Sequence, residues 1–154
     1  MVLSVACLLA VSVMAIAPAR AQVPEHQDVV LRGKVLPLAT ALRQARADLR
    51  FDAGPVEKQV ALVGNDGELL PLLSDEASRA LFLDERLRDR PVEIKGRRLR
   101  GLPYLQVVSF KVEEGGRLRT PEYYCIICSI RVRFPQTCPC CQGEMELRMK
   151  PEKD

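Results

Sequence analysis

VALVGNDGELLPLLSDEASRALFLDERL, residues Val60 to Leu87, carries the most informative pattern in this chain. Two apolar runs flank Gly-Asn-Asp-Gly, whose residues readily adopt the positive φ angles of hairpin turns. Pro71 places the second of these strands near a sheet edge. Ser74 then opens a segment with acidic residues in its first turn and apolar residues at helical spacing. We therefore expect a β-hairpin followed by a helix over Ser74 to Leu87 that docks on the sheet.

Segments on both sides of this stretch alternate apolar and polar residues, as half-buried strands do. Gln27 to Leu38 predicts the first strand, with a kink or bulge at Gly33. Pro91 to Leu99 and Leu102 to Val112 predict the fourth and fifth strands. The residues expected to face inward or to be half-buried there are Val92, Ile94, Tyr104, Val107 and Phe110.

Two connecting segments complete the pattern. Thr40 to Phe51 has apolar residues at helical spacing among arginines and predicts a short surface helix. Glu113 to Arg119 is polar and glycine-rich, and predicts a turn that leaves the strands.

The order of these elements is typical of a five-stranded barrel of the oligonucleotide/oligosaccharide-binding (OB) type. A small β-sandwich with an added helix is the alternative. A helix between the third and fourth strands favours the barrel. The predicted fold class is therefore mainly β, a β-rich α+β fold with one or two short helices.

Composition limits the possible partners. The 154 residues are 47% hydrophobic and 28% charged, as in one globular domain with an appendage. The 23 basic and 20 acidic residues give a formal charge of only +3, so no strong overall field attracts nucleic acid or anionic lipid. Aromatic residues make up 5% of the chain and Trp is absent, so stacking platforms for bases are scarce.

The amino-terminal segment predicts export. Val2 to Ala17 is apolar or small and uncharged, Pro18 ends the run, and Ala19-Arg20-Ala21 has the small-x-small pattern of a cleavage site. The run is shorter than the roughly 20 apolar residues that a membrane-spanning helix needs. We therefore expect a signal peptide at 1–21, a mature protein in the periplasm or cell envelope, and only transient contact with the membrane.

Cysteines are concentrated near the carboxyl end, in CIICSIRVRFPQTCPCC at Cys125 to Cys141. Cys125 and Cys128 form one C-x-x-C pair, and Cys138 and Cys141 form another, closely followed by Gly143 as in the tight turns of zinc knuckles. Four thiolates complete a tetrahedral zinc and leave no position for water. The spacing therefore predicts a metal-type hairpin held by a structural zinc.

Other roles of these cysteines stay open at this point. Exported proteins usually oxidise their cysteines to disulfides. Soft thiolates also suit copper(I) or redox chemistry, and Met145 and Met149 follow, although ordinary apolar packing explains both methionines. Cys140 is the odd thiol, which could replace Cys138 or Cys141 as a ligand, pair with a partner, or be buried.

The chain resembles a family of small exported bacterial OB-like proteins that end in a cysteine-rich segment. The resemblance is carried by LRGKV, VGNDGELLPLL, ALFLDERLRDRPVEIKGR, EYYCIICSI and CPCCQGEMEL, the last two being the specific ones. It implies export and an OB-like barrel. From the sequence pattern we place the barrel over residues 22–119 and a zinc-ribbon-like tail over 120–150. The resemblance also implies Cys125, Cys128, Cys138 and Cys141 as the metal ligands.

No set of residues has the make-up of a catalytic apparatus, so an enzyme is not predicted. Pairs of acidic residues such as Asp84 with Glu85 are expected to be solvated charges. The first hypothesis is a binding or structural module with an unknown protein partner in the cell envelope. The second is handling of zinc, copper or thiols.

The third hypothesis is binding of nucleic acid or oligosaccharide by the barrel. Four basic residues on or after the predicted fourth strand suggest it, and they are Lys95, Arg97, Arg98 and Arg100. On a strand, such charges are more often a solvated face. Export also removes the usual substrate, so nucleic acid is not expected as a partner.

Overall fold

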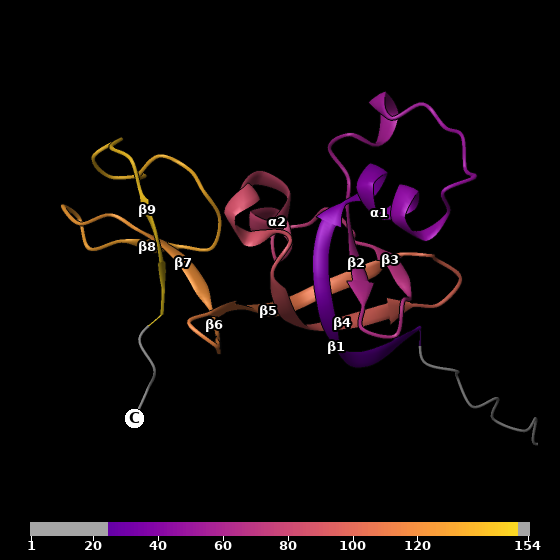
Figure 1. The fold of residues 1–154 in the computed structure, drawn as a ribbon. Coiled ribbons are helices and arrows are strands. Elements are labelled where there is room, and N and C mark those ends of the chain that lie inside the picture. The colour runs from indigo at the N-terminus through magenta and orange to yellow at the C-terminus, as the bar shows by residue number, and fades with distance from the viewer. Residues whose placement is uncertain (1–24, 151–154) are drawn as a thin grey trace, which may run out of the picture.

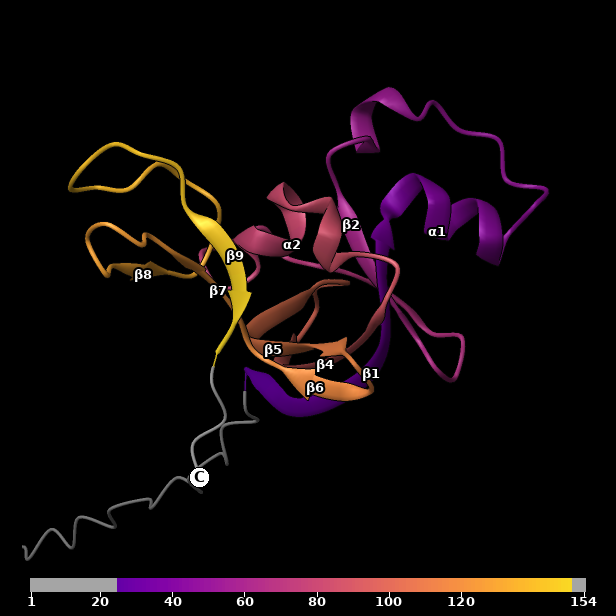
Figure 2. The same ribbon diagram turned by 60° about the vertical axis from the view of Figure 1, so that its left-hand side comes forward.

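The computed structural model describes residues 25–150, and the predicted signal peptide at 1–21 lies outside the described residues. The described chain is mainly β and contains two antiparallel sheets (Figures 1 and 2). Within this part of the chain, no helix has the length and apolar character needed to cross a membrane.

The larger sheet has six strands in the order β3-β2-β1-β4-β5-β6. β1 is its central strand, because it pairs with β2 through Gly33 to Pro37 and with β4 through His26 to Lys34. The bounds are β1 His26–Pro37, β2 Val60–Gly64, β3 Leu69–Pro71, β4 Pro91–Leu99, β5 Leu105–Glu114 and β6 Arg117–Arg119.

The smaller sheet contains the cysteine-rich segment and has the order β8-β7-β9. Its strands are β7 Pro121–Tyr124, β8 Arg131–Val132 and β9 Glu146–Met149. Figure 1 shows this sheet at one side of the molecule, with α2 between it and the larger sheet. The predicted metal-type hairpin is therefore part of a three-stranded sheet.

The structure differs from the five-stranded OB-like barrel expected from the sequence. The larger sheet has six strands and is not closed. β3 ends at Pro71 after three residues, and beyond it a single isolated bridge joins Leu72 to Leu105 of β5. The sixth strand arises because Gly115 and Gly116 adopt positive φ and reverse the chain, so that β6 pairs with β5 instead of leaving it.

The helices are shorter than expected, at α1 Leu38–Ala45 and α2 Arg79–Leu83, with 3₁₀ turns at Gly54–Val56 and Glu85–Leu87. α2 starts five residues after Ser74, which is therefore not its cap. Asp75 and Ser78 instead exchange hydrogen bonds, from each backbone N–H to the other side chain, at 3.0 Å each. These reciprocal bonds close a polar turn just before α2, in the pattern of a capping box.

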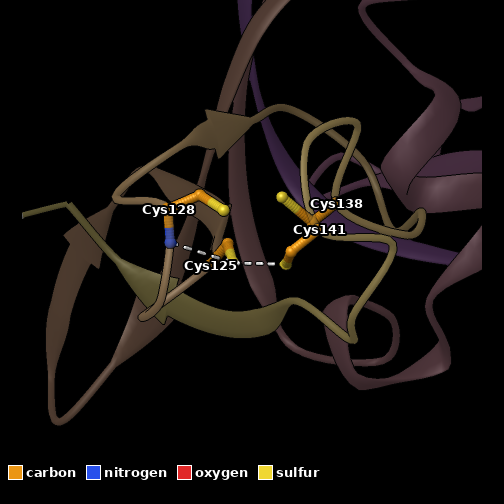
Figure 3. A group of neighbouring side chains, drawn as sticks. All are labelled: Cys125, Cys128, Cys138 and Cys141. Atoms are coloured by element: carbon orange, nitrogen blue, oxygen red, sulfur yellow. Dashed lines mark hydrogen bonds between the residues drawn. The ribbon is translucent and has the colours of Figure 1, made fainter.

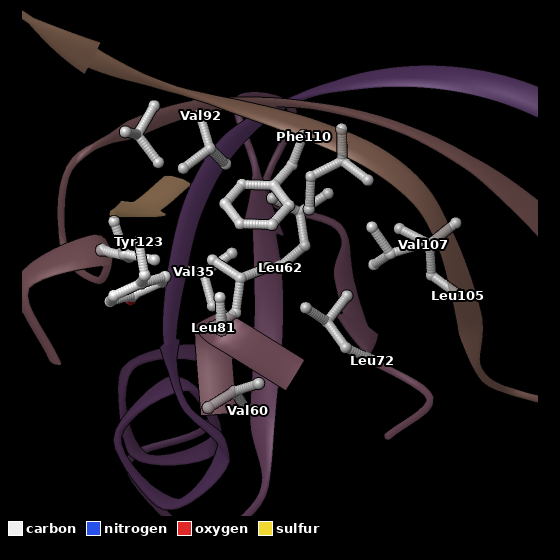
Figure 4. Close-up of a cluster of buried hydrophobic side chains, with 14 residues drawn as sticks. Val35, Val60, Leu62, Leu72, Leu81, Val92, Leu105, Val107, Phe110 and Tyr123 are labelled. Atoms are coloured by element: carbon white, nitrogen blue, oxygen red, sulfur yellow. The ribbon is translucent and has the colours of Figure 1, made fainter. Parts of the chain in front are cut away.

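The core lies between the larger sheet and α2 (Figure 4). Four of the five residues expected to face inward are buried, but Tyr104 is 39% exposed because it precedes β5 in the loop. One core residue, Tyr123, comes from β7 of the smaller sheet. The buried cluster is Val35, Val60, Leu62, Leu72, Ala80, Leu81, Leu87, Val92, Ile94, Leu105, Val107, Phe110, Val112 and Tyr123.

Two glycines allow the central strands to approach closely. A Cβ atom on Gly33 would lie 2.0 Å from the carbonyl oxygen of Val63, and one on Gly96 would lie 2.7 Å from that of Gln106. The irregularity expected at Gly33 occurs instead between Lys95 and Gly96, where the pairing of β4 with β5 shifts register. Gly33 is required for close packing of β1 against β2.

Replacing Gly33 by alanine should lower the free energy of unfolding by more than about 2 kcal/mol, because backbone on β2 would have to move. Urea unfolding followed by circular dichroism measures the change. Gly54→Ala is the control, since its Cβ would meet only the Asp52 side chain at 3.5 Å, and a change within about 1 kcal/mol is expected there. Equal stability of Gly33→Ala and the parent would contradict the described register.

Candidate metal centre

The first cysteine pair lies in a tight loop directly after β7. The backbone N–H of Cys125 donates to the Ile130 carbonyl at 3.0 Å, and the N–H of Ser129 donates to the Cys125 carbonyl at 2.8 Å. Ser129 has a φ of 56°, in the left-handed region. These bonds turn the chain around Cys128 and direct both thiols to one side of the loop.

The second pair repeats the same backbone pattern. The N–H of Cys138 donates to the Gly143 carbonyl at 2.8 Å, and the N–H of Gln142 donates to the Cys138 carbonyl at 2.9 Å. Gln142 has a φ of 59°. The left-handed residue of this loop is therefore Gln142, directly before Gly143. Two loops with the same pattern thus hold the two C-x-x-C pairs.

The four sulfur atoms converge on one point (Figure 3). The Sγ atoms of Cys125, Cys128, Cys138 and Cys141 all lie within 4.8 Å of one another, and those of Cys125 and Cys141 are 3.6 Å apart. A tetrahedral zinc with Zn–S bonds of about 2.3 Å separates its sulfurs by about 3.8 Å. A disulfide needs about 2.05 Å, and all five described cysteines are free thiols. The arrangement could therefore hold a metal ion.

Backbone N–H groups are directed at the first sulfur of each pair. The N–H of Cys128 donates to Cys125 Sγ at 3.4 Å. In the second loop, hydrogen bonds from the N–H groups of Cys141 and then Cys140 lower the pKa of the Cys138 thiol to about 7. Such donors stabilise thiolates and are typical of the surroundings of metal-bound cysteine.

The depth of the cluster differs from one sulfur to the next. Cys125 and Cys138 are buried, Cys128 is half-buried and Cys141 is exposed. Cys140 is exposed and stands outside the group of four. Hydrogen bonding with the Cys140 thiol, and then with that of Cys141, raises the pKa of the Cys128 thiol well above 9.0. The fifth thiol therefore lies next to the cluster without belonging to it.

Tyr123 anchors the first cysteine loop to the larger sheet. It lies two residues before Cys125, its side chain is fully buried, and its hydroxyl donates to Asp84 Oδ2 at 2.6 Å. Arg86 donates to the same carboxylate from its backbone N–H at 3.0 Å, from Nε at 2.9 Å and from Nη2 at 2.7 Å. A buried contact therefore positions the first cysteine pair.

The sequence analysis misjudged Asp84, which was expected to be a solvated charge. Its exposure is 6%. Burial alone would raise the pKa of Asp84, but hydrogen bonds from Arg86 and Tyr123 outweigh this and lower it from the usual 3.8. The carboxylate is thus stabilised in its charged form by two partners, one of them 39 residues away.

A second polar group supports the smaller sheet. Glu122 is only 2% exposed, and it accepts a hydrogen bond from Arg148 Nε at 2.8 Å and lies 3.5 Å from Arg131 Nε. Met145 and Met149 pack against the hydrophobic core. Apolar packing therefore accounts for both methionines that the sequence placed near a soft-metal site.

The four basic residues considered for polyanion binding are partly engaged. Arg97 pairs with Asp28, with 3.3 Å between Nε and Oδ1, and Arg98 donates to Glu68 at 2.7 Å from Nη1 to Oε1. These ion pairs join β4 to β1 and to the β2–β3 turn, so they have a structural role in the sheet.

The chemistry of this site has to be interpreted from its own residues. The chain matches no protein-family model, and no curated protein or solved structure is significantly similar to it. The family resemblance stated from the sequence therefore stays a prediction.

Substituting phenylalanine for Tyr123 should lower the free energy of unfolding by about 1–3 kcal/mol, because the buried Asp84 carboxylate loses a hydrogen bond. Urea unfolding of the metal-loaded protein measures the change. Tyr124→Phe is the matched control, since the Tyr124 hydroxyl makes only an exposed bond of 3.2 Å to Ser129. Equal effects of the two substitutions would contradict the role given to Tyr123.

The contribution of Asp84 should depend on pH with a definite sign. Because its folded pKa is lowered, its charged form stabilises the fold above the unfolded pKa of about 3.9, and this stabilisation is lost as pH falls through the lower folded value. Asp84→Asn should therefore cost about 1–2 kcal/mol at pH 6 and less at pH 2. Urea unfolding across this range provides the comparison, and a cost that grew on acidification would refute the assignment.

Proposed function

We propose that this protein is a non-enzymatic binding or structural module of the cell envelope, and that a structural zinc holds its carboxyl-terminal segment. The observation that carries the zinc proposal is the repeated backbone pattern of the two cysteine loops. In both loops, the carbonyl of the first cysteine accepts a hydrogen bond from the backbone N–H four residues later. Two such loops bring four sulfurs within 4.8 Å of one another, which is close enough for a single ion to bind all four.

A structural role is favoured over a catalytic one by the number of thiols. A catalytic zinc keeps one coordination position for water or substrate, whereas four cysteine ligands occupy all of them. Two of these thiols are also buried in the structure. The acidic pair of Asp84 and Glu85 adds no acid–base candidate, since Asp84 is committed to Tyr123 and Arg86.

Zinc is favoured over disulfides by the same geometry. Disulfides would join the sulfurs two by two, and nothing would then require all four to converge. Backbone N–H donors lower the pKa of the Cys138 thiol to about 7, and the thiolate is the form that binds metal. Export, which is inferred from the amino-terminal sequence, makes the oxidation state of these thiols the point to test.

The strand order supports a distant OB-type relationship for the larger sheet. Its first five strands follow the order β3-β2-β1-β4-β5, and the isolated parallel bridge between Leu72 and Leu105 joins the two ends of that series. We propose an open OB-related sheet, with oligosaccharide or nucleic-acid binding as a further, less favoured function.

A second candidate function is exchange of metal or thiols. It is favoured by the exposure of Cys140 and Cys141, and by the proximity of the Cys140 thiol to Cys128. An incoming thiol or metal would reach the cluster from this side. If this function holds, zinc should transfer rapidly to a competing chelator in the parent protein and more slowly in Cys140→Ser.

Elemental analysis of the natively exported protein should give about one zinc per chain. Cys138→Ser should lose the metal and lower the melting temperature by more than about 10 °C, because loss of several kcal/mol of metal binding is transmitted through Tyr123. Cys140→Ser is the matched control and should keep both metal and melting temperature.

Cys138→Ser has to be distinguished from a variant that simply fails to fold. Stripping zinc from the parent protein with a chelator should give the same drop in melting temperature, and adding zinc back should reverse it. Purified protein that lacked metal and showed disulfides among Cys125, Cys128, Cys138 and Cys141 by mass spectrometry would overturn the zinc proposal.

A further inference from the structure

The open sheet leaves part of β5 without a neighbour. One edge of β5 pairs with β4 from Leu105 to Val112, whereas the other pairs with β6 only from Val112 to Glu114. At the start of β5, the Leu105 carbonyl accepts a hydrogen bond from Leu73 N–H at 3.0 Å. Among residues 25–150, no backbone hydrogen bond is made to this second edge between residues 106 and 111.

The gap arises where the chain changes sheets. After β6 ends at Arg119, only Thr120 precedes β7, which pairs with β8 and β9 instead of β5. Pro121 has no N–H to continue the ladder with β5. Figure 2 shows β6 alongside β5, and β7 turning away from it toward β9. A wedge therefore opens between β5 and the smaller sheet.

A groove of about 310 Å³ occupies this wedge. Its apolar surface comes from both sheets and from the turn before α2, namely from Ala77, Val108, Phe110, Pro121 and Val132. Val108 is 46% exposed even though it lies in the middle of a strand. The groove thus offers apolar contacts beside an unpaired strand edge.

The charge around the groove is positive. Arg131, Arg133 and Lys150 line it, and the only acidic residue in the lining is Glu122. Glu122 is already engaged by Arg148 and Arg131. Arg133 and Lys150 are both exposed. An anionic partner would therefore meet exposed cations at the groove.

We propose that the edge of β5 between residues 106 and 111 binds an extended acidic peptide segment of a partner protein, which adds to the sheet as a further strand. This inference names the partner class of the binding module and so rests on the proposed function. Strand addition uses main-chain hydrogen bonds for affinity and side-chain contacts for specificity. A second copy of this chain presenting the same face would bring like charges together, which disfavours self-pairing.

The test uses the full mature protein, loaded with zinc and labelled with ¹⁵N. The probe is an acetylated and amidated heptapeptide of alternating glutamate and valine. Saturable binding is expected, with the largest amide shift changes at residues 106–111 and 131–133. The same peptide with proline at its central positions should not bind, because it cannot form the strand ladder. A peptide of alternating lysine and valine should not bind either.

Charge reversal provides the matched variants. Arg133→Glu combined with Lys150→Glu should weaken binding of the acidic peptide at least about fivefold. Lys58→Glu reverses an exposed charge in the segment before β2 and should leave binding unchanged. Equal weakening by Lys58→Glu would indicate diffuse charge attraction and overturn the proposal.

The remaining outcomes are also decisive. Absence of binding would mean that the cations only protect an exposed edge, and a peptide-independent dimer in light scattering would mean that a second copy occupies it. Either result overturns the acidic peptide as occupant.

Zinc content measured on the same sample separates the two proposals, because zinc retained without peptide binding refutes only this inference. Peptide binding without zinc refutes only the metal site.

Discussion

The arrangement of the carboxyl-terminal half depends on Tyr123 in the core. Its ring occupies the hydrophobic cluster of the larger sheet, and its hydroxyl satisfies the buried carboxylate of Asp84. Because backbone and side chain are both fixed there, Cys125 enters its loop from a defined point, and β8 and β9 pair with a strand that is already positioned. Truncating this side chain would cost packing and would also leave a charge with fewer partners.

The four-cysteine cluster adds a constraint of a different kind. The short cysteine loops have little hydrophobic surface to bury, so the smaller sheet needs another source of stability. Convergent thiols supply it if they bind a metal, because the affinity of the folded protein for the ion becomes part of its folding free energy. Ser129 and Gln142 both hold left-handed conformations that non-glycine residues adopt at a cost, and the fold retains them in both loops.

Local features of this structure could be predicted from the sequence, and long-range ones could not. Gly-Asn-Asp-Gly predicted the β2–β3 hairpin and the C-x-x-C spacing predicted convergent thiols, because each depends on a few neighbouring residues. The hydrogen bond between Tyr123 and Asp84 joins residues that are far apart in the sequence, and no local sequence pattern identifies either of them. Closure of the sheet was predicted wrongly. It depends on the length of β3 and on the path of β6, and neither can be predicted from the alternation of apolar and polar residues.

Passage of the chain from β6 to β7 through Thr120 alone has a mechanical consequence. A flexible linker would let the cysteine-rich segment tumble separately from the larger sheet, whereas here one nearly continuous strand is shared by both. A force that turned the cysteine loops would therefore act directly on the hydrogen bonds between β5 and β6. The two sheets should therefore reorient in solution as one rigid unit, and the wedge between them should keep its width.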